Sequence, residues 1–276
     1  MTQPAEVTLS ILGSTFRISS DDERMAELAR ELWEPFLTTD GGAFLEAIVE
    51  SRDEGWHLVI PDEPRVGATD PWVLASSLRN SLSRRAIRAA TSIVPLHAAA
   101  VERDGVVVVL AGPPRAGKTT LLLDLLECGW LLVTDDLVPL DPATLTATPF
   151  PKPLSVRDPE RWARLAGGWD VPDWLPPPAT VGLLPATAVP CSTLEEYSPG
   201  VLVFPTFEPG AEPAIDPLSP AAVVAWAADN LHTRPPGAAG VLPALARLGQ
   251  RTRGYRVTYG STENALELME KCLAGP

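Results

Sequence analysis

The sequence predicts an α/β protein in two parts, a small α+β lobe over residues 1–91 and an α/β domain over residues 92–276. Two observations support this division. The first part mixes short strand patterns with amphipathic helix patterns, whereas the second opens on apolar strands that run into a glycine loop and a helix. With 276 residues, of which 45% are hydrophobic, the chain can bury one large core or two smaller ones.

In the lobe, the patterns predict a hairpin, a helix, two further strands and a long amphipathic helix that begins at Asp70-Pro71. The predicted elements are strands 7–13 and 14–20, helix 21–36, two strands within 44–60, and helix 70–91. The last helix carries Arg79, Arg84, Arg85 and Arg88. These arginines form either a docking face for an acidic acceptor or an ordinary solvated face.

In the second domain, apolar runs alternate with helix patterns, which is typical of α/β proteins. The predicted elements are strands 93–105 and 106–112, helix 119–129, strand 130–136, strand 201–205, helix 219–232, strand 254–260 and helix 262–273. Many of the thirty prolines fall between residues 139 and 243, which predicts long ordered loops there.

The net charge of −13 argues against a nucleic-acid or anionic-membrane partner, because such partners require an excess of Lys and Arg. The three cysteines, Cys128, Cys191 and Cys272, form no CxxC pair and indicate neither a zinc site nor a disulfide framework. The first residues do not read as a targeting signal, and no apolar run is long enough to span a bilayer. We therefore expect a cytoplasmic protein.

The segment GPPRAGKTT fits the pattern G-x-x-x-x-G-K-[ST] between a strand and a helix. Such a P-loop turns backbone N–H groups toward phosphates, while the lysine reaches the β/γ-phosphates and the following hydroxyl enters the Mg²⁺ shell. For Arg115 a phosphate contact and a solvated surface position are both open. The predicted nucleotide-binding residues are Gly112, Pro113, Pro114, Arg115, Ala116, Gly117, Lys118, Thr119 and Thr120.

Two acids, Asp135 and Asp136, follow the apolar strand after this helix. An acid at such a strand end can hold Mg²⁺, and a second can accept the proton of an attacking hydroxyl. The alternative is that one of them only caps the next turn. His97 precedes the loop, and taken alone it is more typical of a satisfied core residue than of a catalyst.

The spacing of these motifs resembles the catalytic domain of the HPr kinase/phosphorylase family. Gly112 lies fifteen positions after His97, and Asp135 lies seventeen positions after Lys118. The resemblance covers residues 93–140, and continues more weakly through 149–157, 201–205 and 255–260. It implies a P-loop nucleotide-binding domain with a mixed sheet, like that of phosphoenolpyruvate carboxykinase.

The resemblance also implies transfer of the γ-phosphoryl group of ATP to a hydroxyl, usually a serine of a protein or peptide. Relatives phosphorylate precursors of lasso peptides. By this likeness the catalytic set is His97, Lys118, Asp135 and Asp136, and the Mg²⁺ ligands are Thr119, Asp135 and Asp136. Which aspartate takes the proton stays open. HPr kinases form hexamers, so the resemblance favours a homo-oligomer.

The likeness has one clear departure. The segment PKPLSVRDPERW contains no counterpart of the metal-binding glutamate and glycine signature of the bacterial regulators. The resemblance therefore does not extend to reverse phosphorolysis or to HPr itself as the acceptor. Lys152 and Arg157 in this segment either contact phosphates or the acceptor, or lie on a solvated surface.

Three functions follow from the sequence. The leading one is a kinase for a Ser or Thr hydroxyl of a peptide or small protein. The second is a kinase for a small-molecule alcohol, and the third is an ATP-binding regulatory module that transfers nothing. The pair of aspartates with His97 favours a kinase, because a nucleotide sensor needs no proton acceptor.

Overall fold

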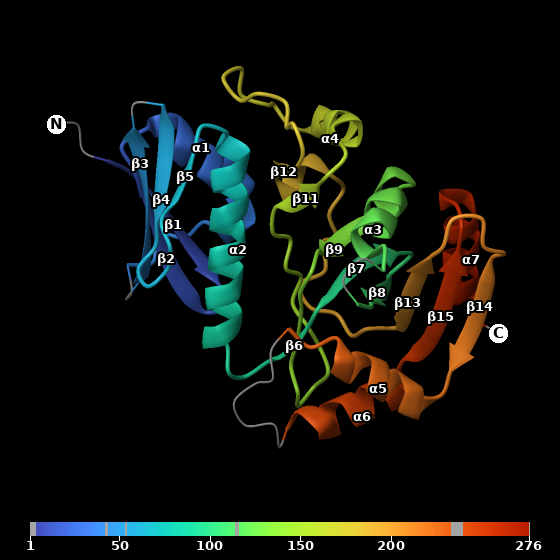
Figure 1. The fold of residues 1–276 in the computed structure, drawn as a ribbon. Coiled ribbons are helices and arrows are strands. Elements are labelled where there is room, and N and C mark those ends of the chain that lie inside the picture. The colour runs from blue at the N-terminus through green and yellow to red at the C-terminus, as the bar shows by residue number, and fades with distance from the viewer. Residues whose placement is uncertain (1–3, 42–43, 53, 114–115, 233–239, 276) are drawn as a thin grey trace. The chain divides into compact units, whose positions relative to one another are not determined.

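The computed structural model describes residues 4–41, 44–52, 54–113, 116–232 and 240–275. The chain divides into two compact units, each of which is visible as a set of strands and helices in Figure 1. The first unit comprises Met1–Ala90 and Lys152–Val189, and the second comprises Thr91–Pro151 and Pro190–Pro276. The chain therefore leaves the first unit, returns to it, and leaves it again.

The first unit contains a five-stranded sheet in the order β1-β2-β3-β4-β5. Its strands are β1 (Ala5–Ile11), β2 (Ser14–Ser20), β3 (Phe44–Arg52), β4 (Gly55–Val59) and β5 (Val66–Ala68). Only β2 and β3 are parallel, because helix α1 (Glu23–Leu32) and the 3-10 turn η1 (Glu34–Phe36) connect them. Buried Val7, Leu9 and Ile11 alternate with more exposed residues along β1, so the sheet has one apolar face.

Helix α2 (Pro71–Ala89) packs on β4 and β5 of this sheet. Its arginines are mostly engaged within the unit. Arg79 is only 7% exposed and donates to the carbonyl oxygen of Pro153 at 2.6 Å. Arg84 and Arg85 pair with Glu63 at 2.6 and 2.8 Å. Arg79 is therefore not part of a docking face, since it holds the returning chain segment.

That returning segment lies in the domain that the sequence assigned to residues 92–276, but in the structure it packs with the first unit. It contains β11 (Leu154–Val156), α4 (Pro159–Leu165), β12 (Gly182–Leu184) and the 3-10 turns η2 (Ala166–Gly168) and η3 (Ala186–Ala188). The physical reason is a cluster of tryptophans. The Trp72 ring of α2 lies 5.4 Å from that of Trp162 and 6.5 Å from that of Trp169. Trp72 Nε1 also donates to the carbonyl oxygen of Pro176 at 2.7 Å.

The second unit is built on a six-stranded sheet in the order β14-β15-β13-β8-β7-β9. Its strands are β7 (Ala98–Arg103), β8 (Val106–Ala111), β9 (Leu131–Thr134), β13 (Val201–Phe207), β14 (Ala214–Leu218) and β15 (Arg253–Tyr259). β8, β13 and β15 pair in parallel, whereas β7 and β14 run antiparallel to their neighbours. The sheet is mixed, as predicted.

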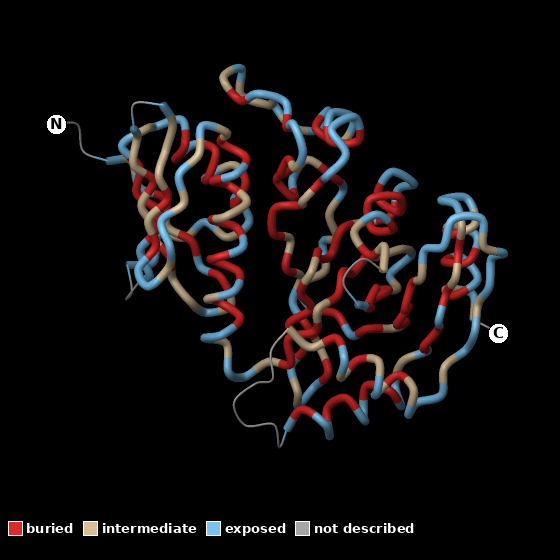
Figure 2. Tube along the Cα trace, viewed as in Figure 1, coloured by how far each residue is buried: buried red, intermediate tan, exposed pale blue. Residues whose placement is uncertain are grey.

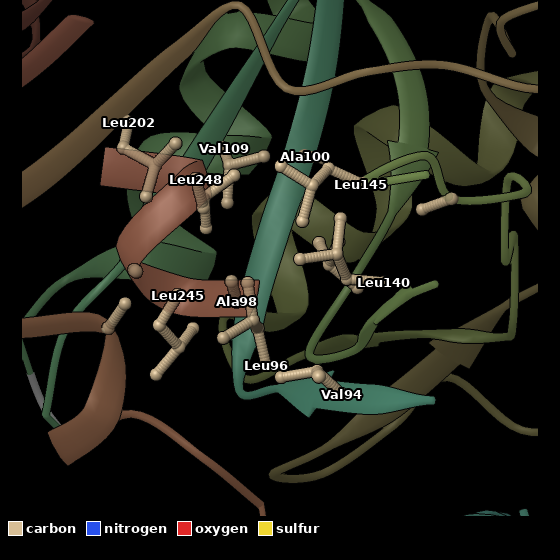
Figure 3. Packing of buried hydrophobic residues seen from close by; sticks show 14 of the residues in the cluster. Val94, Leu96, Ala98, Ala100, Val109, Leu140, Leu145, Leu202, Leu245 and Leu248 are labelled. Carbon is tan, nitrogen blue, oxygen red and sulfur yellow. The ribbon is translucent and has the colours of Figure 1, made fainter. Parts of the chain in front are cut away.

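Helices cover both faces of this sheet. They are α3 (Lys118–Glu127), α5 (Pro220–Asp229), α6 (Val241–Arg251) and α7 (Thr262–Ala274). Figure 3 shows Leu248 of α6 near Val109 and Leu202 of the sheet and Leu245 near Ala98, while α3 packs on β7 and β8 and α7 packs on β13 and β15. The central strands are accordingly buried along most of their length (Figure 2). Within the described residues, no helix has the length and apolar character needed to cross a membrane.

The strand predicted over residues 93–105 is interrupted at His97. Residues before it form β6 (Val94–Leu96), which pairs with β10 (Val138–Leu140) in a separate two-stranded ladder, and residues after it form β7. The continuous strand prediction is wrong at this point, because His97 turns the chain from one ladder into the other. Hydrophobic alternation does not report such a change of partner.

The N-terminus of α1 offers a test of stability. Asp22 accepts the N–H of Arg24 as the helix cap, pairs with the Arg24 guanidinium at 2.7 Å and accepts from Trp56 Nε1 at 2.9 Å. The hydrogen bond from Arg24 is the main reason why the pKa of Asp22 falls to about 2, against the opposing effect of burial. We expect Asp22→Ala to lower the free energy of unfolding in urea by about 1–2 kcal/mol at neutral pH.

Because the folded pKa is depressed, the contribution of the charged cap is complete above the unfolded pKa of about 3.9 and is lost as pH falls through about 2. The gap between wild type and Asp22→Ala should shrink over that range. Glu23→Gln, at an exposed position in the same turn, should change stability by no more than about 0.5 kcal/mol. A gap that does not change with pH would contradict this account of the cap.

Candidate functional site

The topology of the second sheet brings several chain segments to one edge. β8, β9, β13 and β15 share one direction, so their carboxyl ends meet at that edge. β7 runs the opposite way, and Ala98 at its start lies opposite Ala111 at the end of β8. The loop after β8, the aspartates after β9 and His97 before β7 therefore lie at the same edge of the sheet.

The predicted P-loop connects the end of β8 to the first turn of α3, as its pattern requires. Gly117 is the N-cap of the helix and has a left-handed φ of 91°, a conformation that favours glycine. The first turn contains no acidic residue, so its N–H groups present the positive end of the helix dipole. Pro114 and Arg115, two of the predicted phosphate-binding residues, lie outside the described residues.

Lys118 is 9% exposed and curls back over the loop. Its Nζ donates to the carbonyl oxygens of Gly112 at 2.6 Å and Pro113 at 3.2 Å. Burial lowers the pKa of this ammonium, and the charges of Asp136 and Asp135 oppose the shift. Both carboxylates are thus close enough to Lys118 to act on its charge. Thr119 beside it is half-buried and Thr120 is exposed.

The two aspartates have different environments at the end of β9. Asp135 is 3% exposed, whereas Asp136 is half-buried and has a φ of 71°, in the left-handed region that Asp tolerates better than most residues. The Thr134 hydroxyl lies 2.7 Å from the carbonyl oxygen of Leu137 and 2.9 Å from that of Phe150. These contacts fix the tight turn that carries both carboxylates.

His97 lies directly against this turn. Its Nδ1 is 2.8 Å from Oδ1 of Asp136. The β6–β10 ladder explains the contact, because it places Leu96 opposite Val138. His97 comes directly after Leu96, and Asp136 comes two residues before Val138, so the antiparallel pairing brings the two side chains together. The structure therefore brings together His97, Lys118, Asp135 and Asp136, which the sequence predicted as one site.

The sequence prediction missed His232, which follows α5. Its Nε2 lies 3.2 Å from Nδ1 of His97 and 2.5 Å from the main-chain oxygen of Asp136. A β-bridge between Leu96 and Leu231 holds the two histidines side by side. The main-chain N–H of His97 donates to the main-chain oxygen of Asn230 at 2.7 Å, and the main-chain N–H of His232 donates to that of Pro95 at 2.9 Å.

A weak signal for His232 was present in the sequence. The chain has three histidines, and two of them occur in the dipeptide Leu-His, at residues 96–97 and 231–232. Nothing local relates the two dipeptides, because the histidines are 135 residues apart in the chain. Only the fold brings them into contact.

Lys152 and Arg157 belong to the first compact unit and not to the unit that carries the loop. Lys152 is fully buried, whereas Arg157 is exposed. Their predicted contacts with phosphate or acceptor remain predictions.

The edge thus combines three chemical capacities within one unit. The N-terminus of α3 and Lys118 can bind an anion, and the oxygen donors of Thr119 and Asp135 suit a hard cation such as Mg²⁺. Asp136, hydrogen-bonded to His97, can accept a proton.

No protein-family model matches the chain, and no curated protein sequence matches it. Among solved structures, it is similar to the Hpr(Ser) kinase/phosphatase from Coxiella burnetii with a TM-score of 0.33 and 12% sequence identity. That match covers 65% of this chain and 93% of the other. Similarity at this level assigns no family to the chain.

The cap of α3 gives a second test. A Cβ at Gly117 would lie 3.0 Å from the Tyr259 hydroxyl oxygen and 3.3 Å from Phe207 Cβ, in addition to requiring a left-handed backbone. Gly210 also has a positive φ, of 76°, but a Cβ there meets nothing within 4 Å. Gly210→Ala should therefore cost about 1–2 kcal/mol of unfolding free energy from the backbone alone. Gly117→Ala should cost roughly 1 kcal/mol more from crowding.

Urea unfolding of the two variants measures both costs. Equal destabilisation would show that Tyr259 and Phe207 do not crowd the cap of α3.

Proposed function

We propose that this chain is an ATP- and Mg²⁺-dependent kinase that transfers the γ-phosphoryl group to a serine or threonine hydroxyl of a peptide or small protein. One observation carries the proposal. A glycine loop and helix N-terminus, a buried lysine and two aspartates, one of them bonded to a histidine, share one edge of the sheet.

The loop and Lys118 supply the phosphate site. The N–H groups of the first turn of α3 and the loop amides can hydrogen-bond phosphate oxygens, and the helix dipole adds to their attraction. Lys118 is already at the loop, with its Nζ at the Gly112 carbonyl oxygen, and a short movement would place it on phosphate. Its burial makes this charge effective, because little water screens it.

Thr119 and Asp135 are the residues that would hold Mg²⁺. Their oxygens are the ligand type that this ion prefers, and Asp135 is both buried and close enough to Lys118 to affect its pKa. When bound, Mg²⁺ neutralises charge that develops on the transferring phosphate. A buried carboxylate beside a lysine also balances the charge of the site when no ion is present.

Asp136 would accept the proton of the acceptor hydroxyl. As the O–H bond breaks, the oxygen forms a bond to the γ-phosphorus, and the bond from that phosphorus to the bridging oxygen breaks, so that ADP leaves with the electron pair. The contact between His97 Nδ1 and Asp136 Oδ1 fixes the orientation of the carboxylate. In the proposed mechanism Asp135 is the metal ligand and Asp136 is the base, a division that the sequence left open.

The acceptor class rests on the motif spacing. The intervals from His97 to Gly112 and from Lys118 to Asp135 resemble those of HPr kinases, which phosphorylate a serine of a protein, and relatives act on lasso-peptide precursors. A precursor of a ribosomal peptide product is therefore a first choice of acceptor. Phosphorylation of free serine or a sugar instead would identify a small-molecule kinase.

Lys118→Ala should abolish phosphorylation of a peptide acceptor, because it removes the charge that reaches the phosphates. Mass spectrometry of candidate peptides incubated with Mg-ATP would measure the product as a gain of one phosphate. Lys271→Ala, at an exposed position of α7, is the matched control and should phosphorylate at the wild-type rate.

A near wild-type rate for Lys118→Ala would exclude the proposed mechanism. ATP-dependent association with a partner, with no phosphorylated product from the wild-type protein, would identify a regulatory module instead.

Substitutions at the two aspartates should have different effects on turnover and on nucleotide binding. Asp136→Asn should lower kcat by roughly 10²–10⁴-fold and change the Kd of Mg-ATP much less, because it removes the proposed proton acceptor and keeps the proposed Mg²⁺ ligand Asp135. Asp135→Asn should instead weaken Mg-ATP binding. Steady-state kinetics and calorimetric titration separate the two effects, and a reversed pattern would exchange the roles of the two residues.

A further inference from the structure

His232 lies beside the proposed catalytic residues, and the kinase mechanism above gives it no role. Three side-chain atoms, Nδ1 of His97, Nε2 of His232 and a carboxylate oxygen of Asp136, lie within 4.8 Å of one another. All three residues are half-buried, so the group is neither fully solvated nor closed to a ligand. Such a convergence of two imidazoles and a carboxylate calls for an explanation of its own.

The contacts among these groups leave the approach of the two ring nitrogens without a hydrogen bond. If His97 Nδ1–H donates to Asp136 Oδ1 at 2.8 Å and His232 Nε2–H donates to the Asp136 main-chain oxygen at 2.5 Å, each N–H points at its own oxygen, and the 3.2 Å contact between the two nitrogens is not a hydrogen bond. If either nitrogen instead accepts from the other, its lone pair also faces an oxygen. A cation bound between the two neutral imidazoles would take the lone pair of each of these nitrogens and one from the carboxylate.

We propose that His97, His232 and Asp136 form a binding site for a divalent transition metal ion of the Zn²⁺ class. Imidazole nitrogens favour such ions over Mg²⁺, which prefers oxygen ligands. Ligands arranged tetrahedrally at about 2.0–2.1 Å from Zn²⁺ lie roughly 3.3–3.4 Å from one another. The separations here are 2.8, 3.2 and 4.0 Å, so small side-chain adjustments reach that geometry.

The backbone holds the three ligands in place. The Leu96–Leu231 bridge and its two flanking N–H···O bonds fix both histidines, and the turn anchored by Thr134 fixes Asp136. Because the ligands are positioned by main-chain contacts, binding an ion requires little ordering of the chain. Three protein ligands leave a further position for water or a phosphate oxygen, as in many zinc sites.

The site has a consequence for the reaction, and this consequence rests on the proposed function. An ion held by Asp136 and His97 occupies the carboxylate that would accept the hydroxyl proton. Zn²⁺ should therefore inhibit phosphorylation, and a chelator selective for Zn²⁺ over Mg²⁺ should restore it. Binding itself involves no nucleotide, so it can be measured independently of any kinase activity.

Calorimetric titration of the chelator-treated full chain with Zn²⁺, in the absence of ATP, tests the proposal. Cys128 is exposed and thiolates bind Zn²⁺, so all proteins should carry Cys128→Ser. We expect one equivalent to bind, and His232→Gln or His97→Gln to weaken binding by about tenfold or more. His57→Gln, which removes the remaining histidine, should leave the affinity unchanged.

Equal Zn²⁺ affinity of wild type, His232→Gln and His97→Gln would overturn the proposal and leave the triad as a hydrogen-bonded group only. Circular dichroism confirms that each variant is folded. Failure of the chain to phosphorylate any acceptor would leave the titration result intact, so the two proposals fail separately.

Discussion

The position of Leu96 between two partners is the constraint on which the site depends. On one side it pairs with Val138 of β10, and on the other it forms a bridge with Leu231 after α5. Leu96 is 2% exposed and belongs to the core that Figure 3 shows, so this arrangement is packed as well as hydrogen-bonded. It brings His97, Asp136 and His232 together although they come from three separate parts of the chain.

Charged groups at this edge lie close to groups of opposite charge, which explains how they can lie near a core. Lys118 is buried beside Asp135 and Asp136, and its Nζ also donates to loop carbonyl oxygens. A buried charge without a partner would destabilise the fold considerably. A bound polyphosphate with Mg²⁺ would replace the loop carbonyl oxygens as partners of Lys118 and would place the cation beside the carboxylates. The same carboxylate and imidazole that suit proton transfer also suit a transition metal, so catalysis and metal inhibition would compete for one residue.

The sequence predicted most of what is local and little of what depends on distant contacts. The strand, glycine loop and helix around Lys118 were predicted because their pattern is continuous, and the apolar run that ends at Asp135 and Asp136 identified the next strand. The break at His97 was missed because both halves are apolar and only their partners differ. The return of residues 152–189 to the first unit depends on Trp162 packing against Trp72 of α2. Hydrophobic periodicity does not predict contacts between residues so far apart in the chain. His232 was missed for the same reason.

The most direct test of the central claim is NMR of the full chain labelled with ¹⁵N at histidine, titrated with Mg²⁺ and a non-hydrolysable ATP analogue. The chain has three histidines, and His→Gln variants assign each signal. If the edge beside the loop holds the nucleotide phosphates, the ring signals of His97 and His232 should shift to saturation. The signal of His57, in β4 of the other unit, should stay in place. Unchanged His97 and His232 signals at saturating nucleotide would contradict the account.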